Sequence, residues 1–360
     1  MVAKVKKGGS LTALMRSGKA PVVERRGFDL HRFPTPRKFD EADAFLRTLN
    51  ERREVIAHVP AEHLRGFDMD GNVKGSEWRM SEAAFSDLCS FTKAQTSFVK
   101  KMACYDENLG MELVHGMIEG AFDGDGCSLV IDTSQNVIEG IVSRKYTPVS
   151  HAEILEAALS VKSRMEFRTG FLSGPNMRAT IVDPFSAVEP KKGDVVRFGL
   201  SLENATNGDC SATVSGYNER LVCANGMVAR GSEWERSVRH VGDALYHVQK
   251  ATLNAIRVFA LAPTLNRATE LYPDPDQLKD FFAWVGNKRA GGTPTLASRV
   301  AELAMNEAIR EHRDEANVTL WNLTNGLTEA AHDTRSIQRR SEIESMAYAG
   351  VLNFSEAWAA

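Results

Sequence analysis

The chain has 360 residues, of which 43% are hydrophobic and 25% are charged. This balance is typical of a folded protein with a large core, and the length exceeds that of one ordinary domain, so we expect more than one structural region. The formal net charge of -3 excludes a uniformly basic nucleic-acid coat, because phosphate neutralisation needs clustered Lys and Arg. No apolar run approaches the ~20 residues of a spanning helix, and the N-terminal MVAKVKKGGSL has no apolar export core. We therefore expect a cytoplasmic protein without a membrane partner.

The chain has five cysteines, an odd number, and they are widely spaced with no C-x-x-C pair. This pattern predicts buried thiols in a reducing compartment rather than disulfides or a zinc site. The five are Cys89, Cys104, Cys127, Cys210 and Cys223.

Residues 1 to 20 are basic and contain Gly and Ser, which predicts a flexible arm. Lys4, Lys6 and Lys7 can contact phosphates or simply keep this arm solvated, and the sequence leaves both readings open.

Residues 21 to 125 form a mainly helical N-terminal region. Asp40 is placed to cap a first helix, and a short strand is expected around residues 55 to 59. Ser81 opens a second helix, and the helical pattern continues to about residue 118.

Residues 126 to 262 change to the two-residue period of strands. We expect a hairpin over residues 128 to 146, a helix over residues 150 to 164 and two strands between residues 167 and 183. This order predicts an α+β core domain with a central, mostly antiparallel sheet and a helix over one face.

Residues 195 to 228 predict three further β-segments separated by turns. The turns are expected at residues 204 to 209 and at the Asn-Gly pair of residues 225 and 226. Ser232 followed by Glu235 has the pattern of a capping box, so a long helix should begin there.

Residues 263 to 360 predict a helical C-terminal region. The Asp-Pro pair at residues 274 to 275 and the Thr-Pro pair at residues 293 to 294 each open a helix. A final long helix should include residues 320 to 331.

The β-segments of residues 195 to 228 resemble the signature of the phage and plasmid-like proteins that carry domain of unknown function 932. Segments at residues 80 to 88, 143 to 148 and 325 to 329 resemble further motifs of that family, so the resemblance covers roughly residues 25 to 350. It implies a relationship to mobile genetic elements of bacteria, in a family without a settled activity. The matching signature residues are Asn204, Gly208, Arg220, Cys223, Asn225 and Gly226.

One candidate catalytic or metal site combines Asn325, Glu329 and His332, which share a helical face at positions i, i+4 and i+7. The alternative is a buried hydrogen-bond network that locks this helix to the sheet domain. Only one E-x-x-H pair is visible, whereas a di-iron bundle needs two.

Two other candidates are weaker. His240, Asp243 and His247 are expected on one long helix, as metal ligands or as solvent-facing residues. Cys223 is either a nucleophile or a packed thiol at the end of a strand.

The last candidate is a basic surface with interleaved aromatic residues, the combination that binds single-stranded nucleic acid. Residues 140 to 200 contain nine Lys or Arg and six Asp or Glu, a local excess of three positive charges. Strand alternation predicts that Arg168 and Phe171 lie on opposite faces of the sheet. The alternative is an ordinary solvated surface. The predicted binding residues are Arg144, Lys145, Tyr146, Arg168, Lys191, Lys192 and Arg197.

The leading hypothesis is a DNA-metabolism protein of phage or plasmid type that binds single-stranded DNA, in an annealing or recombination-like role, without catalysis or a cofactor. We expect it to form a homo-oligomer. An enzyme centred on Glu329 and His332 and an interaction protein that inhibits a host factor are the alternatives.

Overall fold

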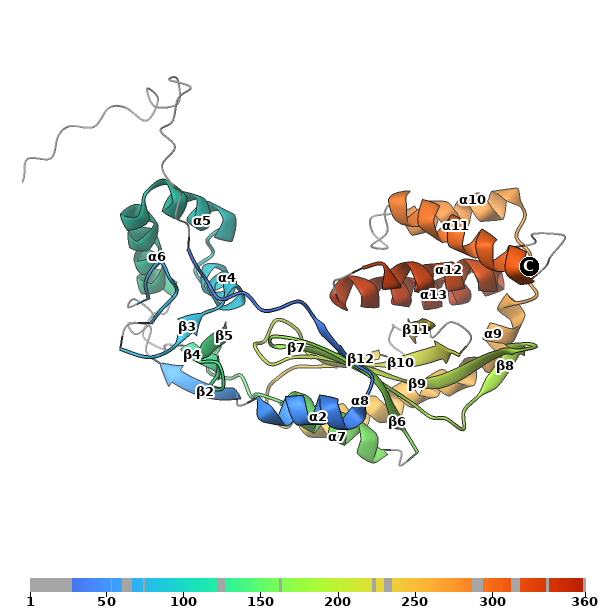
Figure 1. Cartoon of the computed structure of the whole chain (residues 1–360), viewed down its shortest axis with the longest axis horizontal. Helices are drawn as coiled ribbons and strands as arrows, with labels where there is room; N and C mark the ends of the chain where they lie inside the picture. Colours follow the sequence, from blue (N-terminus) through green and yellow to red (C-terminus); the bar gives the residue numbers. More distant parts are fainter. Residues whose placement is uncertain are drawn as a thin grey trace, which may run out of the picture. The chain divides into compact units, whose positions relative to one another are not determined.

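The computed structural model describes residues 28–52, 54–59, 67–73, 75–121, 127–161, 164–221, 225–229, 235–286, 294–311, 318–334 and 337–358 (Figure 1). The chain divides into two compact units. The first comprises Met1–His31 with Val59–Gly126, and the second comprises Arg32–His58 with Cys127–Ala360. Residues 32 to 58 thus join the second unit, and the C-terminal helices form no unit of their own. The predicted arm of residues 1 to 20 lies outside the described residues.

The described part of the first unit is mainly helical. Ser81 caps α4 through its Oγ, which accepts a hydrogen bond from the Ala84 N–H at 3.0 Å. The ring of Phe85 packs 4.7 Å from that of Phe28 and 6.2 Å from that of Phe67. Its elements are β3 (Arg79–Met80), α4 (Glu82–Phe91), α5 (Thr96–Tyr105) and α6 (Glu107–Ala121).

The second unit contains a large sheet in which every pairing is antiparallel among the described strands. The main path has the order β1-β6-β7-β9-β10-β11, while β12 also pairs with β10 and β8 pairs with β9. The strands are β1 (Arg37–Phe39), β6 (Glu166–Ser173), β7 (Asn176–Val182), β8 (Val188–Lys191), β9 (Asp194–Ala205), β10 (Ala212–Arg220), β11 (Asn225–Ala229) and β12 (Glu235–Val238).

One face of this sheet is apolar and is covered by helices. α2 (Ala42–Glu51), α7 (His151–Val161) and α8 (Ala244–Ala255) lie along it (Figure 1). Alternate strand residues such as Leu200 and Leu202 pack there against Phe45 and Val248, with side chains fully removed from water. The α+β architecture predicted from the order of elements is confirmed.

The opposite face of the sheet is polar, although it too is buried. Arg178, Thr180, Ser201 and Ser215 lie on it, because the strand registers place Thr180 opposite Ser201 and Ser201 opposite Ser215. Arg178 forms a buried ion pair with Glu344 of the last helix. Charge pairing thus fastens this face to a C-terminal helix.

A smaller sheet places β2 (Glu54–Val59), β4 (Cys127–Asp132) and β5 (Val137–Val142) side by side. β4 and β5 form the predicted hairpin, with a bulge between Val130 and Ile131. Arg52 lies beside this sheet and forms a largely buried ion pair with Glu139, in which Nη2 is 2.6 Å from Oε1.

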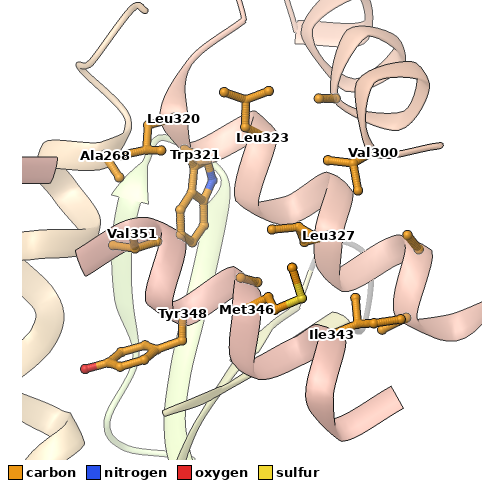
Figure 2. Packing of buried hydrophobic residues seen from close by; sticks show 14 of the residues in the cluster. Ala268, Val300, Leu320, Trp321, Leu323, Leu327, Ile343, Met346, Tyr348 and Val351 are labelled. Atoms are coloured by element: carbon orange, nitrogen blue, oxygen red, sulfur yellow. The ribbon is translucent and has the colours of Figure 1, made fainter. Parts of the chain in front are cut away.

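The C-terminal helices enclose a second core with the end of the large sheet. Figure 2 shows Val300, Leu327 and Met346, from three different helices, turned towards one another, and Trp321 is buried in the same cluster. The elements are η1 (Ile256–Leu261), α9 (Ala262–Ala268), α10 (Pro275–Gly286), α11 (Pro294–Glu311), α12 (Leu320–His332) and α13 (Ile337–Ala357).

Arg220, a residue of the signature, connects this core to the sheet. Its Nε donates to Asp194 Oδ1 at 2.6 Å, and it is also paired with Glu307 of α11. Trp321 of α12 donates its indole N–H to Asp194 Oδ2 at 2.7 Å. This buried network holds β9, β10, α11 and α12 together.

Several predicted elements differ from the structure. The Asn-Gly pair at residues 225 and 226 begins β11 instead of forming a turn, because it pairs with Arg220 and Glu219 on β10. Residues 235 to 238 form β12 along the same edge of β10, so no helix begins at Glu235. The helix starts at Ala244, and Asp243 is its cap.

Two differences concern the other helices. Glu41, not Asp40, is the cap position of α2, while Asp40 pairs with Lys38 at 2.8 Å. The C-terminal region also contains α13, a helix of 21 residues beyond the predicted last one.

Candidate nucleic-acid interface

Strand β12 and helix α8 border a groove of about 370 Å³ in which the charged side chains are all basic. None of the residues that line it is Asp or Glu. We call it the basic groove. Its lining consists of Arg236, Ser237, Val238, Arg239, Val241, His247, Lys250, Ala251 and Asn254.

The local fold explains why these side chains meet. Asp243 Oδ1 accepts a hydrogen bond from Tyr246 N–H at 3.2 Å, which starts α8 one short loop after β12. Val248 and Ala251 then face the core, so His247, Lys250 and Asn254, at positions i, i+3 and i+7, are left on the side of the groove.

The acids next to the groove are engaged elsewhere. The Asp243 carboxylate caps α8, and Glu235 Oε2 accepts a hydrogen bond from Ser215 Oγ at 3.3 Å. Beyond Asp243 the sequence contains no Asp or Glu from Ala244 to Ala268. The field at the groove therefore favours an anionic ligand.

A second basic segment lies beside the groove. The ring of Tyr146 stacks on that of His240, with centroids 5.1 Å apart and planes inclined by 5°. Thr147 N–H donates to the His240 carbonyl at 2.8 Å. The exposed residues Arg144 and Lys145 directly precede Tyr146 in the chain, and Arg239 directly precedes His240.

The same contacts define the protonation of His240. Tyr146 Oη lies 2.6 Å from the carbonyl of Thr206 and donates to it, so its oxygen accepts from His240 Nδ1 at 3.0 Å. His240 is then neutral with its proton on Nδ1. Burial lowers the pKa of His240 to about 4, which agrees with this assignment.

The turn of the signature packs against this pair. Asn204 Nδ2 donates to the Val149 carbonyl at 3.1 Å and to His151 Nδ1 at 2.9 Å. Burial, with the positive charge of Arg52 and the proximity of His240, lowers the pKa of His151 well below its usual range. Two buried neutral histidines therefore hold the turn in place.

Two glycines make the turn possible. Gly208 has φ +89°, a conformation that side chains disfavour. A Cβ at Gly140 of β5 would lie 2.6 Å from the Asn207 carbonyl oxygen, so the hairpin can approach the turn only without one. The signature residues Asn204 and Gly208 thus have structural roles.

The predicted binding residues fall in three places. Tyr146 stacks on His240, Arg144 and Lys145 precede it in the chain, and none of the three lines the basic groove. Lys191 and Lys192 are at the turn between β8 and β9, and do not line the groove.

Arg168 and Arg197 are on the polar face of the sheet, which also carries the buried carboxylate of Glu219. Arg168 is paired with the buried Glu219, and Glu219 lies opposite Arg197 in the register of β9 and β10. Arg178 pairs with Glu344, and Arg164 with Asp183 at 3.6 Å. The local excess of positive charge in the sequence is therefore largely offset on this face.

The expected separation of Arg168 and Phe171 is wrong. A bulge between Phe167 and Thr169 shifts the strand by one residue, and both side chains lie on the polar face. Phe171 is covered there by the guanidinium of Arg340, 5.1 Å from the ring centroid.

The three α12 candidates differ in burial, and a side-chain hydrogen bond is seen for His332. Asn325 is buried, Glu329 is half-buried and His332 is exposed. His332 Nε2 accepts from Arg340 Nη2 at 3.0 Å, because an arginine can only donate, so this nitrogen has no lone pair left for a metal. Partial burial and the charge of Arg340 also lower the pKa of His332.

No group of three or more His, Cys, Asp or Glu is placed to hold a metal within the described part of the chain. The set of His240, Asp243 and His247 fails because His240 precedes α8 and points to Tyr146, while Asp243 is the cap.

The thiols differ in exposure. Cys89 and Cys127 are buried, as predicted, but Cys104 is half-buried and Cys210 is exposed. Burial raises the pKa of Cys127 to about 11. Cys223 lies outside the described residues.

The sequence interpretation missed Arg236, Arg239 and Lys250. The sequence does indicate a basic surface here, because Arg236 and Arg239 are followed by a stretch without Asp or Glu from Ala244 to Ala268. This pattern was obscured because the whole segment from Ser232 was interpreted as one amphipathic helix.

The fold and the groove together define an α+β protein with a helix-covered antiparallel sheet and a cationic edge. A family model described as "Domain of unknown function (DUF932)" matches residues 139–349, more than half of the chain. The chain belongs to this family, as its motifs indicated. The match includes the signature, the basic groove and the α12 motif, while residues 80 to 88 lie outside it. The searches of curated proteins and of solved structures found no match. Among the described helices, none is long and apolar enough to cross a membrane.

Proposed function

We propose that this protein binds single-stranded DNA at the basic groove, without catalysis, as a DNA-metabolism protein of a phage or plasmid-like element. The observation that carries the proposal is the groove itself, in which Arg236, Arg239 and Lys250 converge without a lining carboxylate. Phosphate contacts supply most of the sequence-independent affinity for nucleic acid.

The neighbourhood of the groove supports a polyanion rather than a single small anion. The exposed Arg144 and Lys145 precede the segment that hydrogen-bonds to His240, next to Arg239, and the exposed Arg257 follows the end of α8. These further cations suit a ligand that has several phosphates.

A binding titration tests the proposal. The affinity for a fluorescein-labelled oligodeoxythymidine is measured by anisotropy for the parent and for a groove variant, Arg236→Ala with Arg239→Ala and Lys250→Ala. We expect the variant to bind at least about ten-fold more weakly, because three phosphate contacts are lost.

Light scattering of the same samples measures the molar mass and so tests whether the protein forms the expected homo-oligomer.

A matched control keeps the result specific. Lys101→Ala with Lys279→Ala and Arg310→Ala removes three exposed cations that do not line the groove. This variant should bind like the parent. Equal losses in the two triple variants, or no binding by the parent at low salt, would contradict the proposal.

A further inference from the structure

An exposed apolar stripe accompanies the basic groove along α8. Tyr246 is 57% exposed and Leu253 is 61% exposed, although both are large apolar side chains. They lie at positions i and i+7, with Lys250 between them at i+4, so the three share one face of the helix. Large apolar groups that face water next to a charged groove are a common mark of a binding surface.

The stripe and the groove are parallel. His247, Lys250 and Asn254 line the groove, while Tyr246 and Leu253 flank them on the same helix. The seven residue steps from Tyr246 to Leu253 span about 10 Å, roughly the length of three stacked bases at about 3.4 Å each. A strand whose phosphates lie in the groove would thus hold its bases against the stripe.

We propose that Tyr246 is a base-stacking residue that gives the basic groove a preference for unpaired over duplex nucleic acid. This inference rests on the proposed function. An exposed aromatic ring can stack on any unpaired base, whereas the bases of a duplex are already stacked on one another and present only their edges in the grooves.

The charge pattern favours this occupant over an apolar partner. Lys250 lies within the stripe, Arg239 lies beside it, and neither the groove lining nor the helix provides a carboxylate. A ligand that is anionic along one side and aromatic along the other matches both surfaces.

The test compares Tyr246→Ala and Tyr246→Phe with Tyr272→Ala, which removes a tyrosine of similar exposure, 56%, outside the groove. We expect Tyr246→Ala to weaken binding of oligodeoxythymidine about ten-fold, while Tyr246→Phe and Tyr272→Ala bind like the parent. The salt dependence of binding should not change in Tyr246→Ala, since no phosphate contact is lost. Affinity for duplex DNA should also stay constant.

A spectroscopic signal separates stacking from a structural effect. An oligonucleotide that contains 2-aminopurine should lose fluorescence on binding the parent and Tyr246→Phe, and lose clearly less on binding Tyr246→Ala at saturation. Equal quenching in all three, or an equal loss of duplex affinity in Tyr246→Ala, would overturn the stacking role.

The outcomes also distinguish this inference from the proposed function. If the groove variant loses binding but Tyr246→Ala does not, DNA binding stands and the stacking role falls. If the parent binds no oligonucleotide but binds vesicles of anionic lipid, both proposals fail and the stripe is a membrane-facing surface.

Discussion

At the scale of single residues, the buried histidines have the clearest physical consequence. His240 and His151 are neutral in the folded protein, and their pKa values are lowered mainly by burial. In the unfolded chain both return to about 6.5. Between about pH 6.5 and about pH 4 the unfolded state therefore binds more protons, and the folded state loses stability as the pH falls.

We expect His240 alone to lower the free energy of unfolding by about 3 kcal/mol between neutral pH and pH 4, since each unit of pKa difference is worth about 1.4 kcal/mol. Urea unfolding at a series of pH values measures this. His240→Gln should lower stability at neutral pH but flatten its pH dependence. A parent whose stability is constant across this range would contradict the assignment of neutral histidines.

Also at this scale, three residues of the family signature make structural contacts. Asn204, Gly208 and Arg220 are recognisable in sequence, yet the contacts of each are structural: a carbonyl and a histidine, a left-handed turn, and a buried ion pair. The residues that we propose to bind DNA, in contrast, belong to no motif that the sequence displayed. Their grouping depends on β12 joining the edge of β10.

At the scale of elements, we expect the buried ion pairs of Arg220 to stabilise the packing of the C-terminal helices on the sheet. Arg220→Met removes the cation that neutralises Asp194 and Glu307 and leaves both carboxylates buried and uncompensated. We expect a loss of about 3–5 kcal/mol of stability. Chemical denaturation measures it, and limited proteolysis should then cut first near α11 and α12.

The control is an arginine whose partners are exposed. Arg299 pairs with Glu302 and Asp333 at 3.0 Å, in water, so Arg299→Met should change stability far less. Similar losses of stability in the two variants would contradict this prediction, because the buried ion pairs would then stabilise the fold no more than the exposed ones.

Elements with strong local signals were predicted well from sequence. Ser81, Asp274 and the Pro at residue 294 each begin a helix as expected, because capping and proline chemistry act within one turn. β12 and the bulge of β6 could not be predicted, because long-range strand pairing creates both. The Ser-Glu pattern that suggested a helix at residue 232 was overridden by pairing with a strand about 20 residues earlier.

At the scale of the whole molecule, several cations counted in residues 140 to 200 are paired with acids that lie far away in the sequence. Arg168 finds Glu219 at a separation of 51 residues, and Arg178 finds Glu344 at a separation of 166. The window of residues 140 to 200 ends before Glu219 and Glu344, so its charge count overstates the free charge of the sheet. The groove, in contrast, forms from one short segment and keeps its charge because the following 25 residues, Ala244 to Ala268, contain no acid.

The salt dependence of oligonucleotide binding tests the central claim most directly. Each phosphate contact to a single strand contributes about 0.7 to the slope of log Kobs against log salt concentration. The groove variant should therefore lose about 2 units of slope relative to the parent, while the control variant with three other cations removed keeps the parental slope. An unchanged slope in the groove variant would show that the basic groove of β12 and α8 is not where this protein holds DNA.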